Sequence, residues 1–242
     1  MKKFYDLHLQ AQLSDFGSVE RMITKAALLG YSGVGVPLPN NVSDVTVSRL
    51  RQLCIDSRID LATRIDLVPK SANELLSVLR RYRRRFELIA VSCLSKTVAR
   101  QAAKDRRVDL ISFPTLNFRN RYFDGAEAEL ASSALTSFEI DISLLLSATS
   151  FERIRLLANL RRETAIASKF SVPVVISSGA KTESLMRKPE DSAALAYLFD
   201  MSSAALKAVS ENPFSIVTRN RTKLLSSFVA PGIRVVNRGR DY

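Results

Sequence analysis

Short stretches rich in β-branched and other apolar residues alternate along the chain with longer stretches in which apolar residues recur every three or four positions. The short stretches predict buried β-strands, and the longer ones predict amphipathic helices. Helix starts are marked where Ser71, Asp124 and Thr149 each precede a glutamate by three residues, the spacing of a capping box. Seven strands are predicted, at residues 4–10, 31–38, 60–67, 86–93, 109–116, 137–145 and 173–180.

The alternation of strands and helices predicts parallel strand pairing, because each connection is long enough to cross back over the sheet. A doubly wound open sheet and a closed barrel both satisfy this pattern. Two observations favour the barrel: the first strand is not followed by a Gly-rich phosphate loop, and the 242 residues are close to the roughly 250 of a (β/α) barrel. Beyond residue 190 the pattern is helical almost throughout. We therefore expect an α/β fold, a distorted (β/α) TIM-like barrel of about seven parallel strands surrounded by helices.

A single domain is expected, because no Pro/Gly-rich linker or low-complexity tract interrupts the pattern and 46% hydrophobic residues allow a sizeable core. The barrel is predicted to cover residues 1–230, and residues 231–242 are predicted to form a basic C-terminal tail, with a late added strand at 233–236. In such a barrel a site lies at the C-terminal ends of the strands. Those ends carry polar residues without a recognisable mechanism, among them Asp6, Arg64, Asp66, Ser92, Asn117, Glu139 and Asp141.

His8 is the only histidine of the chain, and it lies in the first predicted strand, FYDLHLQ. A hydrolytic metal site needs three or more ligands and an open position for water. The segment DLHLQ resembles the D-L-H-x-H strand that opens the polymerase-and-histidinol-phosphatase (PHP) family of metal phosphoesterases, but Gln10 stands in place of the second histidine. We interpret His8 and Gln10 as vestigial metal-site positions and expect His8 to be hydrogen-bonded inside the barrel. We expect neither a metal nor a catalytic residue; the alternative is a weak Mg²⁺ site made of carboxylates.

Lys181 follows the seventh predicted strand and an SSGA segment, which would suit a Schiff-base lysine beside a bound phosphate. A lysine in a loop lacks the desolvation that lowers its pKa, so we favour a solvated residue. Ser177 and Ser178 lack the G-x-S-x-G turn of serine hydrolases. Cys54 and Cys93 stand alone, which predicts two buried free thiols rather than a disulfide or a zinc site.

The chain carries 36 Lys and Arg against 24 Asp and Glu, a formal net charge of +12, which indicates a polyanionic partner. The segment RRYRRR at residues 80–85 favours phosphate contacts, and the helical period places Tyr82 in the core with the arginines outside. Signatures of RRM, KH and zinc-finger domains are absent, so recognition of RNA shape and phosphates fits better than base reading. The residues predicted to bind RNA are Arg80, Arg81, Arg83, Arg84, Arg85, Lys181, Arg187, Lys188, Arg219, Arg221 and Lys223.

The longest apolar runs are far shorter than the roughly 18 residues of a membrane span. Near the N-terminus, Asp6, His8 and Gln10 interrupt any apolar segment of a secretory signal. We therefore expect a cytoplasmic protein without a membrane partner.

Five segments of the chain form a motif set that is specific when its members occur together. They are VDLISFP (108–114), FEIDIS (138–143), VPVVISSGA (172–180), LMRKPEDSAALAYLFDM (185–201) and ALKAVSENPFSIVTRN (205–220). Together, and in this order, they resemble the TIM-barrel protein subunit of archaeal and eukaryotic ribonuclease P, a family called ribonuclease P protein component 3 in archaea. The opening FYDLHL fits the first strand of that family. The resemblance covers nearly the whole chain.

The resemblance implies a PHP-like fold and a role in removing 5′ leaders from precursor tRNAs. It implies that the RNA subunit hydrolyses the phosphodiester with Mg²⁺ ions that the RNA positions, so the chain belongs to an endoribonuclease without being its catalyst and binds no cofactor. The implied partners are the RNase P RNA, precursor tRNA, a small RRM-like protein subunit and other RNase P proteins. The task of the chain itself would be to neutralise closely packed phosphates.

Two other functions stay open at this point. One is a degenerate PHP-type or Schiff-base TIM-barrel enzyme that acts on a phosphorylated small molecule. The other is a protein-interaction scaffold whose charge serves only solubility. Stoichiometric metal with turnover that His8→Ala abolishes would favour the enzyme, whereas assembly with a partner subunit without RNA would favour the scaffold.

Overall fold

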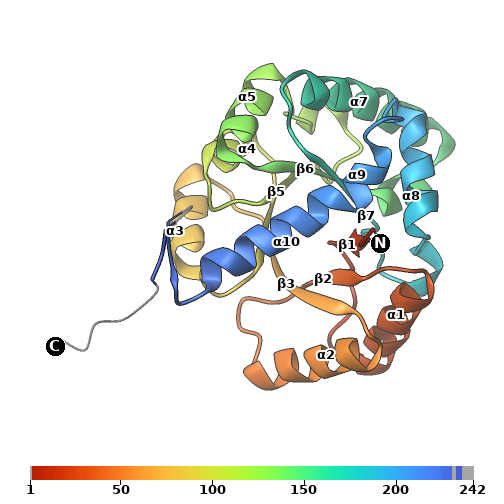
Figure 1. The fold of residues 1–242 in the computed structure, drawn as a ribbon. Coiled ribbons are helices and arrows are strands. Elements are labelled where there is room, and N and C mark those ends of the chain that lie inside the picture. Colours follow the sequence, from red (N-terminus) through yellow and green to blue (C-terminus); the bar gives the residue numbers. More distant parts are fainter. Residues whose placement is uncertain (1, 231–232, 236–242) are drawn as a thin grey trace.

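The computed structural model describes residues 2–230 and 233–235, and within them seven parallel strands form a barrel in the order β1 to β7 (Figure 1). Each strand pairs in parallel with the next one along the chain. The first and last strands meet where Leu9 and Ala180 form a parallel bridge. The predicted barrel is therefore confirmed. Its strands are β1 (Tyr5–Asp6), β2 (Gly33–Pro37), β3 (Asp60–Leu67), β4 (Leu88–Ser92), β5 (Leu110–Ser112), β6 (Ser137–Asp141) and β7 (Val174–Ser177).

Helices surround the barrel and fill the connections between its strands (Figure 1). Ser71 and Asp124 cap two of them by accepting the backbone N–H of the glutamate three residues on, as their spacing predicts. The helices are α1 (Phe16–Leu28), α2 (Asp44–Asp56), α3 (Ala72–Tyr82), α4 (Lys96–Lys104), α5 (Gly125–Ala134), α6 (Ile142–Ser147), α7 (Ser150–Lys169), α8 (Pro189–Leu195), α9 (Ala205–Val209) and α10 (Glu211–Leu224). Short 3-10 segments are η1 (Phe118–Asn120), η2 (Glu183–Leu185) and η3 (Ala196–Phe199).

Several predicted segments differ from the observed elements. Of the strand predicted at 109–116, only β5 is observed. The strand predicted at 137–145 ends at Asp141, because Ile142 and Leu145 are buried at helical spacing and the chain turns into α6. The strand predicted at 4–10 is reduced to β1 and the single bridge at Leu9. The late strand predicted at 233–236 exists as β9 (Ile233–Arg234), but it pairs with β8 (Phe228–Ala230) in a separate antiparallel sheet. Residues 231–232 and 236–242 of the predicted tail lie outside the described residues.

Helix α10 crosses one end of the barrel and completes the core (Figure 1). Its Ile216 is buried in an apolar cluster with residues of β1, β3, β4, β5 and β7. Asn212 Nδ2 donates to the carbonyl of Val174, where β7 begins, and Asn220 Nδ2 donates to the carbonyl of Glu87, directly before β4. These contacts place α10 over the N-terminal ends of the strands, so the opposite end of the barrel is the one where a site is expected.

Leu135 follows α5 in the left-handed conformation, with φ 62° and ψ 31°, and its side chain is 60% exposed. A residue with a Cβ atom costs about 1 kcal/mol more than glycine in that conformation. We expect Leu135→Gly to raise the free energy of unfolding by about 0.5–1 kcal/mol in urea denaturation. Ile154→Gly is the matched control, because Ile154 is 68% exposed inside α7, where glycine should destabilise by about 0.5–1 kcal/mol. Equal effects of the two substitutions would contradict this account.

Candidate functional site

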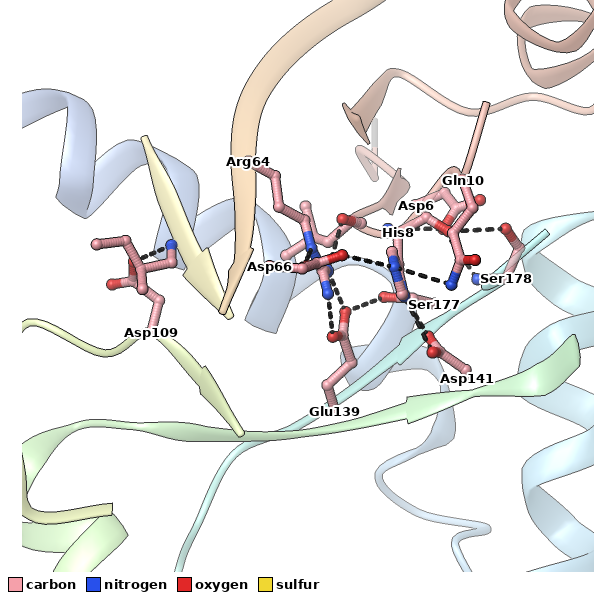
Figure 2. A network of polar contacts seen from close by, with 12 residues as sticks. Asp6, His8, Gln10, Arg64, Asp66, Asp109, Glu139, Asp141, Ser177 and Ser178 are labelled. Carbon is pink, nitrogen blue, oxygen red and sulfur yellow. Dashed lines mark hydrogen bonds and ion pairs between the residues drawn. The ribbon is translucent and has the colours of Figure 1, made fainter. Parts of the chain in front are cut away.

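A network of polar side chains fills the C-terminal end of the barrel, opposite α10 (Figure 2). Its charged residues are two positions apart in the chain, such as 64 and 66 or 139 and 141. Residues two positions apart in a strand point to the same side of the sheet, which here is the barrel interior. Four strands, β1, β3, β6 and β7, and the segment after β1 therefore bring these side chains together. The network consists of Asp6, His8, Gln10, Arg64, Asp66, Glu139, Asp141, Ser177 and Ser178.

Arg64 lies at the centre of this network and is 1% exposed. Its Nη1 and Nη2 atoms donate to the two carboxylate oxygens of Glu139 at 2.6 and 2.7 Å. Its Nε donates to Asp66 at 2.6 Å, and Nη1 also donates to the carbonyl of Leu7 at 2.8 Å. Burial works against the charged form, but Asp66 and Glu139 outweigh it and raise the pKa of Arg64. The guanidinium is a fixed cation inside the barrel.

His8 is the second cation of the network. Its Nδ1 lies 2.9 Å from both oxygens of Asp141, and its Nε2 lies 3.0 Å from Asp66 and 3.0 Å from the side-chain amide of Gln10. Burial and the charge of Arg64 oppose protonation, but the two carboxylates prevail and raise the pKa of His8 to about 10. A carboxylate at each ring nitrogen therefore favours the doubly protonated imidazole. The predicted hydrogen-bonded histidine of the barrel interior is confirmed.

Asp6 anchors the first strand at the edge of the network. Its Oδ1 accepts the backbone N–H of Ser178 at 2.9 Å and that of His8 at 3.2 Å, which ties the first strand to the end of β7. The side chain is buried, and burial raises the pKa of Asp6. Its Oδ2 has no hydrogen-bond partner within the described part of the chain.

Three residues of the network have the spacing of a metal site. His8, Glu139 and Asp141 each offer one ligand atom, and these atoms lie within 4.8 Å of one another. Both oxygens of Glu139, however, accept hydrogen bonds from Arg64, and both oxygens of Asp141 face the protonated ring of His8. To bind here, a divalent ion would have to displace the Arg64 guanidinium from Glu139 and a proton from the His8 ring. The arrangement of these residues does not fit such an ion.

The five arginines of residues 80–85 divide into an internal and an exposed set. Arg83 is partly buried and donates to the carboxylate of Asp109, which is 1% exposed. Arg85 donates to the backbone carbonyls of residues 40 and 42. The prediction that all five extend outward is wrong for Arg83, because the buried carboxylate requires a cation. The predicted core position of Tyr82 is confirmed. The four arginines other than Arg83 are exposed, and of these Arg85 is bound to backbone carbonyls.

Arginines of α10 also pair with carboxylates at the N-terminal end of the barrel. Arg221 Nη1 donates to Asp60 at 2.7 Å, and its Nε donates to Glu87 at 2.6 Å. Arg219 Nη2 lies 3.4 Å from Asp109, the carboxylate that also binds Arg83. The ends of α3 and α10 therefore meet around Asp109.

The remaining predicted cations lie at both ends of the barrel. Lys223 is exposed near Asp109, and burial of part of its stem together with the charge of Arg219 lowers the pKa of Lys223. Lys181 and Lys188 are exposed beyond the C-terminal end of β7, and Arg187 between them donates to the carbonyls of residues 184 and 186. The predicted RNA-binding residues at the end of α3 therefore lie close to those of α10. The predicted residues at 181–188 lie apart from both.

Sequence reasoning found the positions of Arg64, Asp66 and Glu139 but gave them no role. The ion pair between Arg64 and Glu139 joins residues 75 positions apart, and no local spacing indicates such a contact. One signal was present: an arginine in the middle of the predicted buried strand DLATRIDL requires a carboxylate partner. The sequence offers several carboxylates as candidates, and only the barrel selects Glu139.

Comparison with solved structures supports the PHP-like barrel class. The structure matches the cryo-EM structure of archaeal ribonuclease P with mature tRNA, with a TM-score of 0.83 and 22% identity over 92% of this chain and 96% of that one. It also matches a histidinol phosphate phosphatase from Lactococcus lactis, solved with zinc, L-histidinol and phosphate, with a TM-score of 0.54 and 10% identity over 83% of this chain and 94% of that one. At these identities the two likenesses establish the fold.

Comparison of sequences identifies the family. The model of the family described as RNase P subunit p30 matches residues 3–225, and the chain belongs to that family. A ribonuclease P protein component 3 from Methanosarcina barkeri is 31% identical, with 99% of this chain and 98% of the relative covered. Its counterpart from Methanococcoides burtonii is 25% identical, with 97% of this chain and 94% of the relative covered. Among the described residues, no helix is both long and apolar enough to cross a membrane.

The raised pKa of His8 predicts how stability depends on pH. Because the folded pKa of His8, about 10, lies above the usual histidine value of 6.5, the stabilisation from protonated His8 is fully present below pH 6.5 and is lost as the pH rises through 10. We expect the free energy of unfolding of wild type to exceed that of His8→Gln most strongly below pH 6.5. NMR titration of the single imidazole in the full chain gives the folded pKa directly, and a midpoint near 6.5 would contradict the expectation.

Proposed function

We propose that the chain is a protein subunit of ribonuclease P and supports the catalytic RNA in removing 5′ leaders from precursor tRNAs. The family match over residues 3–225 is the observation that carries this proposal. The net charge of +12 supports it, because a cationic protein neutralises closely packed phosphates. The proposed partners, in the cytoplasm, are the RNase P RNA, precursor tRNA, the small RRM-like subunit and other RNase P proteins.

We further propose that the chain binds no metal and is not itself the catalyst. Arg64 and His8 supply the positive charge that a metal ion would supply, and they engage the carboxylates that would ligate it. Mg²⁺ in the holoenzyme would be held through the RNA. The Schiff-base alternative loses support because Lys181 is exposed and so lacks the desolvation that activates a nucleophilic lysine.

We place the principal RNA contact at the end of the barrel where α3 and α10 meet. Arg80, Arg81 and Arg84 are exposed there, and Lys223 belongs to the same charged surroundings through Arg83 and Asp109. Arg83, Arg219 and Arg221 form ion pairs with carboxylates of the protein. They would therefore attract RNA only through the long-range electrostatic field and not through direct phosphate contacts. The group at 181–188 remains a second candidate contact on the other end.

Replacing Arg80, Arg81 and Arg84 together by glutamine is expected to weaken binding of RNase P RNA and to flatten its salt dependence. Each lost contact with a duplex phosphate should lower the slope of log affinity against log salt by about 0.9. The free energy of unfolding should stay within about 0.5 kcal/mol of wild type, because these side chains are exposed. Filter binding over a salt series, with urea denaturation beside it, measures both quantities.

Arg221→Gln is the internal control for that experiment. It removes a cation from Asp60 and Glu87, so we expect the free energy of unfolding to fall by about 1 kcal/mol, a value kept small because solvent screens a part-exposed pair. The salt slope should change little. If the triple variant leaves RNA binding and slope unchanged, the RNA contact does not lie at the end of α3.

Reconstitution of precursor-tRNA cleavage tests the function itself. Omitting this chain from a mixture of RNase P RNA and the companion proteins should reduce the cleavage rate at moderate Mg²⁺, and higher Mg²⁺ should restore part of it, because both neutralise the same phosphates. The chain without RNA should neither cleave precursor tRNA nor hydrolyse phosphoesters with added Mg²⁺ or Zn²⁺. Cleavage that does not depend on the chain at any Mg²⁺ concentration would rule out the proposal.

A further inference from the structure

A groove of about 860 Å³ lies at the rim of the barrel, on the end opposite to α10. One wall is the segment between β5 and η1, with Thr115 and Asn117, and the other is the start of α7, with Phe151 and Arg155. The network around Arg64 does not line it. The groove is therefore a feature separate from the vestigial metal-site positions and from the arginines of α3.

Phe151 presents an aromatic ring to this groove. Its side chain is 62% exposed, although burial of a phenylalanine is worth roughly 1.5–3 kcal/mol. The guanidinium of Arg155 lies over the ring, 4.2 Å from its centroid. The pair forms a flat surface with a positive charge, which is the combination that stacks on nucleic-acid bases. Arg153 on the same helix differs, because it donates to the carbonyls of residues 145 and 148.

The opposite wall offers a polar side chain in a fixed turn. Thr115 Oγ1 accepts the backbone N–H of Asn117 at 3.1 Å, and Asn117 Oδ1 accepts the N–H of Arg119 at 3.1 Å. The amide NH₂ group of Asn117 is a hydrogen-bond donor. Asparagine amides of this kind bind acceptor atoms on the edges of bases. Glu152, the one acid in the lining, accepts from the backbone N–H and hydroxyl of Thr149.

We propose that this groove binds an unpaired nucleotide of RNA, with its base stacked on the Phe151–Arg155 pair. Arg155 would also lie close to the phosphate, and Asn117 would donate to the base edge. The inference rests on the proposed function, since it adds a base-stacking contact to a phosphate-binding protein. An acidic protein segment matches the charge too, but it would not use a flat aromatic and guanidinium surface.

The test measures binding of the full chain to a fluorescein-labelled oligoadenylate of about ten nucleotides by anisotropy over a salt series. Phe151→Ala should weaken binding about tenfold at about 0.15 M salt, since stacking is worth about 1–3 kcal/mol per base, and should leave the salt slope unchanged. Phe151→Trp should keep the affinity. Arg155→Gln should weaken binding and lower the slope by about 0.7, the value for one phosphate of a single strand.

Two exposed apolar residues serve as matched controls. Ile154 is 68% exposed on the same helix, and Tyr197 is 60% exposed on η3. Ile154→Ala and Tyr197→Ala should both bind the oligonucleotide like wild type. If Phe151→Ala binds like wild type, or if Tyr197→Ala weakens binding as much as Phe151→Ala does, the proposal is wrong.

The same variants separate the other outcomes. If Phe151→Ala and Ile154→Ala both weaken assembly with the companion proteins while oligonucleotide binding is unchanged, the groove is a protein-docking surface and the RNA proposal is overturned. Reconstituted cleavage distinguishes this failure from failure of the proposed function. Wild type would still stimulate precursor-tRNA cleavage if only the groove proposal were wrong, whereas it would not if the chain were no ribonuclease P subunit.

Discussion

The centre of the barrel depends on the buried ion pair between Arg64 and Glu139. The guanidinium also binds Asp66 and the carbonyl of Leu7, so it links β3 and β6 with the segment after β1. Removing one partner of a buried pair costs about 3–5 kcal/mol, because the other charge is left without compensation. A barrel that needs these carboxylates for its own cation cannot also give them to a metal ion. Stability and the proposed lack of catalysis by the chain therefore have the same physical origin.

The other end of the barrel uses the same principle with different residues. Asp60, Glu87 and Asp109 stand near the starts of three strands, and arginines from the end of α3 and from α10 bind them. Each of these arginines is paired with a carboxylate, so these pairs contribute little to the net charge. The excess of +12 must then lie mainly on the surface. The protein can therefore have a strongly positive surface field although many of its arginines are paired with carboxylates.

The sequence predicted the parts of the fold that depend on local pattern. Seven strands, the helices between them and the caps at Ser71 and Asp124 follow from apolar period and capping spacing. The turn into α6 after Asp141 was missed, because a short apolar run fits a strand and a helix equally well. The candidate site was predicted less well: whether an arginine is free or paired depends on a carboxylate far away in the chain. Arg83 and Arg84 are neighbours, yet only the structure separates their roles.

Phosphate contacts and base stacking would contribute different properties to RNA binding. Cations at the end of α3 would attract any closely packed phosphates, and salt would weaken this attraction, so charge alone would not fix one position of the barrel on a folded RNA. Stacking on an exposed ring is almost independent of salt and acts only where a base is unpaired. Since the groove at Phe151 and the arginines of α3 lie at opposite ends of the barrel, simultaneous contact at both would determine orientation as well as affinity. A rigid barrel suits that task, because the distance between its two ends is fixed by the strands.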